Sequence, residues 1–232
     1  MKNNIFFLIL IIHFSCDPVD YNEVKSYKEY FPIELEREKH FLVTNIIHSS
    51  LGKDTSSYYL KEIIAESFID LQGDTAYRIE RYSRTDTTDN YTIKDVWVAK
   101  KTTTSVQQTE ENISYTKLIF PIDENSFWNG NAFNNLGYQE YIVQSIHTTF
   151  TLNNLTFDSC ITINQHYKSN LLQYENSQEI YSLGLGLVYK EEIVTQINNG
   201  NQNDILQVSE YIQELIEYLI ILYLKKILFP YL

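Results

Sequence analysis

Hydrophobic and polar residues alternate with a period of two over most of the middle of the chain. In the first such run, Phe41 and Val43 alternate with Leu42 and Thr44. This alternation places successive side chains on opposite faces of a β-strand. Similar runs recur at short intervals, over residues 76–83, 93–101, 115–121, 138–151 and 156–167. Two further segments are ambiguous: residues 58–71 fit a bent strand or a helix, and residues 102–112 fit a strand or a loop.

Turn-forming residues separate these runs. They occupy residues 49–54 and 72–74, and Asn153-Asn154 would form the tip of a hairpin. Strands that recur at short intervals with turns between them are typical of antiparallel sheets. The pattern therefore predicts a mainly β fold, an antiparallel β-sandwich or partly open barrel, over residues 31–198.

The apolar spacing becomes helical near the C-terminus. Asp204 offers an N-cap, with Gln207 in capping-box position. The apolar residues that follow recur every three or four positions: Val208, Ile212, Leu215, Ile216 and Leu219. This spacing predicts a C-terminal α-helix over residues 204–229 that covers an open face or end of the sheet. The alternative is a helix lying on a membrane surface, because its fully apolar part is too short to span a bilayer.

The N-terminus has the pattern of a secretory signal. An apolar run over residues 5–12 is too short for a membrane span but has the length of a signal segment. Ser15 directly before Cys16 resembles a lipoprotein processing site. We therefore predict a lipoprotein signal peptide over residues 1–15, attachment of a lipid such as palmitate to Cys16, and a polar tether over residues 16–30.

Two alternatives to lipid attachment are an ordinary signal peptide cleaved elsewhere and a buried N-terminal strand. His13 departs from the aliphatic residue usual at its place in a lipoprotein site. Asp17 resembles the inner-membrane retention signal of proteobacterial lipoproteins, which other phyla do not read in the same way. The expected location is the bacterial cell envelope with anchoring in the outer membrane, and the leaflet stays open.

Three segments of the sequence resemble a known group of proteins. They are YFPIE near the expected mature start, ENISYTKLIFPIDENSFWNGNAFN in the middle, and EIYSLGLGLVYKEE near the end. In this order they resemble a group of Bacteroidota lipoproteins with a W-N-G-N-A loop and a terminal G-x-G-L-V-Y-K-E strand. The resemblance covers residues 30–192 in patches. No activity is established for this group, so the resemblance implies no site residues.

Net charge excludes one class of partner. The chain carries 18 Lys and Arg against 30 Asp and Glu, which gives a net charge of −12. Phosphate backbones repel so acidic a protein, and we expect no binding to nucleic acid.

The W-N-G-N loop holds the weak candidates for ligand binding, which are Trp128, Asn129 and Asn131. Its many side-chain oxygens could hold calcium, but the EF-hand spacing is not met. The preferred interpretation is a structured turn, in which Gly130 supplies a positive φ and Trp128 anchors the loop on the sheet.

Other possible sites are weaker. Gly184-Leu185-Gly186 precedes a strand rather than a helix, so it indicates a bulge or a close backbone approach and not a dinucleotide loop. Cys160 could meet His147 or His166 as a Cys–His pair, but a small buried thiol is the preferred interpretation. The sequence contains none of the common catalytic or metal-binding motifs. We therefore expect no catalytic residues, no metal and no cofactor.

Three classes of function are consistent with these features. The first is a non-enzymatic envelope lipoprotein that binds a partner protein or scaffolds an assembly. The second is a carrier of an apolar small molecule in an open β-fold, with the C-terminal helix as a lid; a cavity in place of a packed core would favour it. The third, more remote, is a hydrolase, which would need titratable groups clustered in one cleft.

Overall fold

The computed structural model describes residues 27–169, 173–197 and 205–220. Within these ranges the chain forms one short 3₁₀-helix and twelve strands. They are η1 (Lys28–Tyr30), β1 (Arg37–Ser49), β2 (Gly52–Ile69), β3 (Thr75–Arg84), β4 (Thr92–Lys101), β5 (Ser105–Glu110), β6 (Ile113–Ile119), β7 (Phe127–Asn129), β8 (Glu140–Leu152), β9 (Leu155–Ser169), β10 (Gln173–Ser182), β11 (Gly186–Ile197) and β12 (Ile205–Ile220). In this part of the chain, no helix has the length and apolar character needed to cross a membrane.

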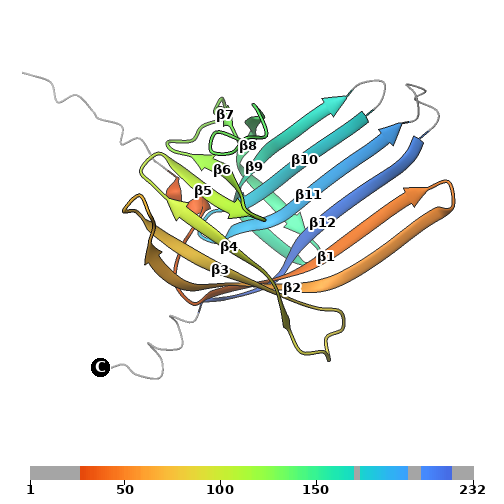
Figure 1. Ribbon diagram of the computed structural model, residues 1–232, viewed down its shortest axis with the longest axis horizontal. Coiled ribbons are helices and arrows are strands. Elements are labelled where there is room, and N and C mark those ends of the chain that lie inside the picture. Colours follow the sequence, from red (N-terminus) through yellow and green to blue (C-terminus); the bar gives the residue numbers. More distant parts are fainter. Residues whose placement is uncertain (1–26, 170–172, 198–204, 221–232) are drawn as a thin grey trace, which may run out of the picture.

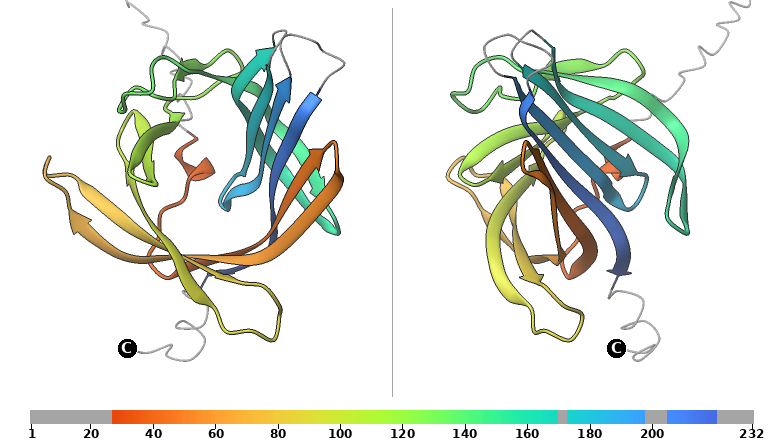
Figure 2. Two further views of the ribbon diagram at one scale, coloured as in Figure 1. Left: turned by 45° about the vertical axis from the view of Figure 1, so that its right-hand side comes forward. Right: turned by 90° about the vertical axis from the view of Figure 1, so that its right-hand side faces the viewer.

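The twelve strands form one antiparallel sheet in the order β6-β5-β4-β3-β2-β1-β12-β11-β10-β9-β8-β7. The sheet curls strongly, so that it forms a partly open barrel with η1 inside its curve (Figures 1 and 2). This confirms the predicted mainly β, antiparallel fold. Most neighbours in the sheet are also neighbours in sequence, and the exception is β1, which pairs with β12 near the other end of the chain.

The two edges of the sheet meet at β6 and β7. The Thr116 amide in β6 donates a hydrogen bond to the Gly130 carbonyl at 2.8 Å, directly after β7. The Trp128 indole N–H donates to the Thr116 carbonyl at 2.7 Å. Asn134 Nδ2 adds a bond of 2.9 Å to the Ser114 carbonyl. The W-N-G-N loop therefore joins the two edge strands, and we call this contact the seam.

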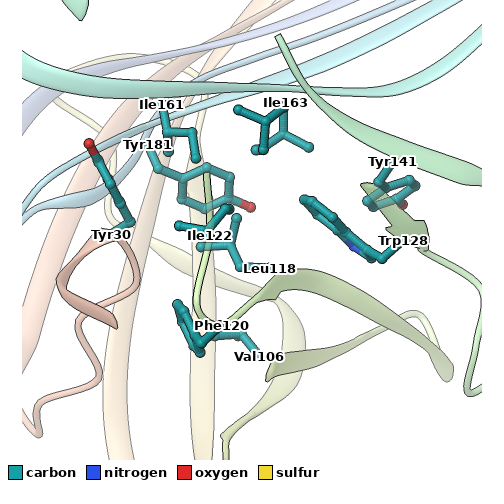
Figure 3. Packing of buried hydrophobic residues seen from close by; sticks show 11 residues of the cluster. Tyr30, Val106, Leu118, Phe120, Ile122, Trp128, Tyr141, Ile161, Ile163 and Tyr181 are labelled. Atoms are coloured by element: carbon teal, nitrogen blue, oxygen red, sulfur yellow. The ribbon is translucent and has the colours of Figure 1, made fainter. Parts of the chain in front are cut away.

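Buried apolar side chains of the described residues form two large clusters and a smaller one inside the curved sheet. Figure 3 shows the cluster beneath the seam, in which Trp128, Tyr141 and Tyr181 pack with the fully buried Tyr30 of η1. The second large cluster includes Phe41, Leu215 and Cys160 from distant strands. The two large clusters stabilise the curved form of the sheet, because each contains side chains from strands that are far apart in the order of the sheet.

The predicted C-terminal α-helix is wrong. Residues 205–220 form β12, which pairs with β1 on one side and β11 on the other. Leu215 is fully buried, whereas Ile216, expected on the same apolar stripe, is 37% exposed. A period of two therefore applies here, and the pairing of both strand edges outweighs the helical spacing. Residues 221–229 of the predicted helix lie outside the described residues.

The folded domain begins earlier than expected. Residues 16–30 were predicted to be a tether, but Tyr30 is completely buried and its hydroxyl bonds His147 Nδ1 at 3.1 Å. Gly184 N donates to the Glu29 carbonyl at 2.8 Å. The last residues of the expected tether are therefore part of the core, while residues 1–26 lie outside the described part of the chain.

Both ambiguous segments are strands. Residues 58–69 belong to β2, which has a bulge between Ile64 and Glu66, and residues 105–110 form β5. The predicted turns separate β1 from β2, β2 from β3 and, at Asn153-Asn154, β8 from β9. Gly184 and Gly186 both have positive φ in the turn between β10 and β11, beside a bulge at Ile180/Tyr181.

Candidate functional site

Ionisable side chains gather inside the curve of the sheet, between the apolar clusters. We call these residues the interior belt. They come from seven strands and are Lys39 (β1), Glu62 (β2), Arg81 (β3), Glu110 (β5), Lys117 (β6), Glu179 (β10) and Lys190 (β11). Such groups are costly to bury unless they are paired, so the belt is the most distinctive feature of the interior.

Side chains along each strand alternate between the inner and the outer face of the sheet. The belt arises because charged residues occupy some of the inward positions. Glu62 lies between Leu60 and Ile64, and all three are buried along one face of β2. Arg81 follows Ile79 on the inner face of β3 in the same way.

Lys117 is the centre of the largest group of ion pairs. Its ammonium group lies 2.6 Å from Glu179 Oε1 and 3.0 Å from Glu110 Oε1. Glu179 also accepts a short hydrogen bond from the Tyr181 hydroxyl. Lys190 lies 3.9 Å from Glu110 and pairs more closely with Glu192, at 2.9 Å. These carboxylates and ammonium ions therefore compensate one another.

The electrostatic environment of Glu110 and Lys117 keeps both side chains charged. Burial opposes ionisation of the Glu110 carboxyl, but the positive charges of Lys117 and Lys190 outweigh it and lower its pKa to about 2. Burial likewise disfavours the Lys117 ammonium ion, but Glu110 and Glu179 raise its pKa above the usual value. General acid–base catalysis works best with a pKa near the ambient pH, and neither group meets this condition.

Arg81 makes a second group of ion pairs with two acids. Its Nε donates to Glu62 Oε1 at 2.9 Å and its Nη1 to Asp95 Oδ2 at 3.1 Å. The guanidinium group also stacks over the Trp97 ring, 3.5 Å from its centroid. This contact fixes the indole as one wall of the interior.

Lys39 differs from the other cations of the belt. Among the described residues, no carboxylate forms an ion pair with its ammonium group and no acceptor bonds it; the group lies 5.3 Å from the centre of the Phe41 ring. Burial lowers the pKa of Lys39, and the negative charge of Glu62 offsets this only in part. Within the described residues, Lys39 is therefore the cation of the belt that lacks a carboxylate partner.

A cavity lies beside Lys39. Its apolar wall is formed by Ile64, Ile79, Trp97 and Leu187. The cavity contains about 620 Å³ of space outside the protein atoms, open solvent at its mouth included, but only about 50 Å³ of it can hold the centre of a water molecule. It is therefore a narrow slot.

Two more donors that line this slot lack an acceptor among the described residues. They are Arg37 Nε and Gln213 Nε2, and both side chains are buried, with 6% and 2% of their surfaces exposed. A buried donor without an acceptor costs free energy. The slot thus combines an apolar wall with unsatisfied donors, which is typical of a binding site for a small molecule.

A second cavity shares Glu110, Lys117 and Lys190 with the slot, and about 150 Å³ of it can hold the centre of a water molecule, against about 50 Å³ in the slot. It is more polar and includes Gln165, whose Nε2 also lacks an acceptor.

The structure places the predicted ligand candidates at the seam rather than at the slot. Trp128 and Asn131 are buried, and Asn131 Nδ2 donates to Gln139 Oε1 at 3.2 Å. Asn129 Oδ1 accepts hydrogen bonds from the amides of Asn131 and Gln139. These contacts are those of a structured turn.

The expected reason for Gly130 is wrong, because Gly130 is not among the glycines with positive φ. A Cβ atom there would lie 2.2 Å from the Tyr141 ring. Glycine is therefore required by the close approach of this ring to the backbone.

The remaining candidates do not come together. Cys160 is a free, completely buried thiol. His147 bonds Tyr30 and Ser159, and His166 bonds Glu175, so no Cys–His pair forms in the described part of the chain. Nor does that part hold a cluster of acidic, histidine or cysteine side chains suited to a metal ion. Cys16 lies outside the described residues.

The belt and the slot were missed by the interpretation of the sequence. A usable signal was present, because Arg81 keeps the same alternating phase as Tyr77 and Ile79. A charged residue in the apolar phase of a strand indicates a buried charge, but it does not reveal the residue with which it pairs.

Comparisons with known proteins add little at the level of function. No protein-family model matches the chain. No curated protein matches it significantly. The fold is similar to a candidate lipoprotein from Parabacteroides distasonis, at 15% identity over 81% of this chain and 98% of that chain, with a TM-score of 0.35. It is also similar to a candidate exported protein with a YmcC-like fold from Bacteroides fragilis, at 11% identity, the same coverage and a TM-score of 0.36. Similarity this weak carries no argument about function.

Proposed function

We propose that the protein is a non-enzymatic binding module of the cell envelope that holds a small, partly apolar molecule in the slot inside its curved sheet. Of the functions considered from the sequence, this one is closest to the carrier. The proposal includes no helical lid, because residues 205–220 of the segment expected to form the lid are strand β12.

One observation carries this proposal: an unpaired cation and two unsatisfied buried donors line a slot with an apolar wall. A protein that only needed a stable core would gain by filling this space or pairing these groups. A bound molecule would do both, because its apolar part would fill the slot and its polar part would accept from the donors.

The state of the belt supports binding over catalysis. A hydrolase requires a group that gains or loses a proton near neutral pH. Glu110 and Lys117 are instead paired, and the lowered pKa of the carboxyl and the raised pKa of the ammonium group keep both charged. They are suited to holding the sheet together and to orienting a ligand.

The envelope location rests on the N-terminal sequence alone. The apolar run over residues 5–12 and the pair Ser15-Cys16 support export and a lipid anchor.

The test uses native mass spectrometry of the full chain, released from its own membrane in mild detergent. We compare the wild type with Ile64→Phe, which places a larger side chain in the slot, and with Ile69→Phe, a control on the same strand where the side chain is 67% exposed. The expected result is a retained small molecule on the wild type and on Ile69→Phe that is strongly reduced on Ile64→Phe.

Thermal unfolding shows whether Ile64→Phe is folded. If no variant retains a molecule, and a lipid extract of the host does not raise the melting temperature of the wild type, the slot is not a binding site.

A further inference from the structure

We propose that the slot binds a single-chain carboxylate, a molecule of the fatty-acid class, with its carboxylate at Lys39 and Arg37 and its chain along the wall formed by Trp97 and Ile79. This inference rests on the proposed function and names the chemical class of its ligand.

The charge of the ligand follows from the pairing inside the belt. Arg81, Lys117 and Lys190 each have a carboxylate within 2.9 Å, at Glu62, Glu179 and Glu192 respectively. Lys39 has none in the described part of the chain, so its positive charge lacks a direct partner there. A group with one negative charge compensates it, whereas a second negative charge would be repelled by the nearby acids of the belt.

The position of the carboxylate follows from the neighbour of Lys39 on β1. Arg37 lies two residues earlier, so both side chains point to the same face of the strand. The Arg37 guanidinium is held by Glu34 at 2.8 Å and by the Gly184 carbonyl at 2.9 Å. These contacts leave its Nε–H, which is buried, without an acceptor. A carboxylate has two oxygens, which could accept from Lys39 and Arg37 together.

The width of the slot selects the apolar part of the ligand. Little of the slot can hold the centre of a water molecule, although the total empty space is large. A hydrocarbon chain is wider than a water molecule, so a single chain enters only as the side chains of the wall move apart, and two chains side by side are excluded. Contact with Trp97, Ile79 and Ile64 would remove the chain from water, which favours binding in proportion to the area buried.

The test compares ligands that differ only in the head group. The full chain, purified from the membrane and kept soluble in an amphiphilic polymer, is titrated at pH 7.5 with dodecanoate, dodecanol and dodecyl phosphate by calorimetry. We expect dodecanoate to bind at least tenfold more tightly than the other two, because only it carries one full charge that matches Lys39.

The matched variants are Lys39→Met, which removes the charge at similar length, Lys39→Arg, which keeps it, and Lys53→Met, a control at an exposed lysine of β2. Lys39→Met should abolish the preference for dodecanoate over dodecanol, while Lys39→Arg and Lys53→Met should retain it. Circular dichroism checks that each variant is folded, and the preference of the wild type tests the proposal even if Lys39→Met does not fold.

Equal binding of dodecanoate and dodecanol to the wild type would overturn the assignment of the head group but leave the proposed function in place. Tighter binding of dodecyl phosphate would overturn the carboxylate. If none of the three binds and no molecule is retained from the membrane, the proposed function itself fails.

Discussion

At the scale of single residues, the largest free-energy costs come from charged side chains that are buried inside the sheet. Removing one partner from a buried ion pair usually costs several kcal/mol, because the other charge is left uncompensated. Glu179 and Lys117 are both almost inaccessible to solvent, and each compensates the charge of the other. No carboxylate of the described residues compensates the charge of Lys39 in this way, and for that reason we infer a ligand there.

Trp128 is a single residue that stabilises the fold through apolar packing and a hydrogen bond. It packs edge-on to Tyr141, with ring centroids 5.9 Å apart, while its N–H bonds Thr116 in the other edge strand. One side chain thus contributes both to the core and to the seam.

We predict that Trp128→Ala lowers the free energy of unfolding by about 3–5 kcal/mol, because it removes a large buried aromatic ring. Trp128→Phe keeps most of the packing and loses the bond to Thr116, so it should cost only about 1 kcal/mol. Urea unfolding measures both. An unchanged stability for Trp128→Ala, together with loss of a bound molecule, would make the W-N-G-N loop a ligand site and not a structural one.

Among the elements, β12 contributes most to the continuity of the sheet. It lies between β1 and β11, so the backbone groups on both of its edges are paired. The sheet would otherwise be interrupted between β1 and β11, leaving two new edges with unpaired N–H and C=O groups. A helix at this place could not satisfy these groups.

The two faces of β12 can be told apart by substitution. Leu215 is fully buried in the core and Ile216 is 37% exposed, although a helix would place both on one apolar stripe. We predict that Leu215→Ala lowers the free energy of unfolding by about 2–5 kcal/mol. Ile216→Ala should cost about 1 kcal/mol or less, within the range of β-propensity effects. Thermal or urea unfolding checks this, and equal losses at the two positions would argue against the strand.

At the scale of the whole molecule, charge is divided between inside and outside. The chain has a net charge of −12, whereas inside the sheet the four cations of the belt face its three carboxylates together with Asp95 and Glu192. A negative exterior favours solubility. Inside the sheet, Lys39 is the position at which an anion would be attracted.

Attachment to the membrane is the remaining prediction at this scale. Cys16→Ser should move the protein from the membrane fraction to the soluble fraction and abolish incorporation of a labelled palmitate analogue, because we predict that the lipid is attached through this thiol. Cys160→Ala is the matched control and should keep both properties, since Cys160 is buried in the core. Fractionation and labelling in cells make the measurement. Retention of Cys16→Ser in the membrane would show that another segment anchors the protein.

The sequence by itself determined most of the strands and their turns. Alternation with a period of two and turn residues such as Asn153-Asn154 are local signals, and the strands β1, β3, β4, β6, β8 and β9 lie where they predicted them. The structural role of the W-N-G-N loop was also predicted in outline, because a tryptophan among turn residues is typical of an anchored loop. Cys16 stays a prediction from the sequence.

Only the tertiary structure decided which strands become neighbours and which charges meet. Residues 205–220 fit a helix when considered alone, and they are a strand because β1 and β11 supply partners for both of their edges. The belt has the same origin in part: Lys117 and Glu179 are 62 residues apart in sequence and pair because the sheet curls back on itself, whereas Glu110 lies on the strand next to Lys117. Spacing along a chain specifies the period of a segment and its apolar face. It does not specify what lies across the interior, and for that reason neither the seam nor the unpaired Lys39 could be derived before the sheet was closed.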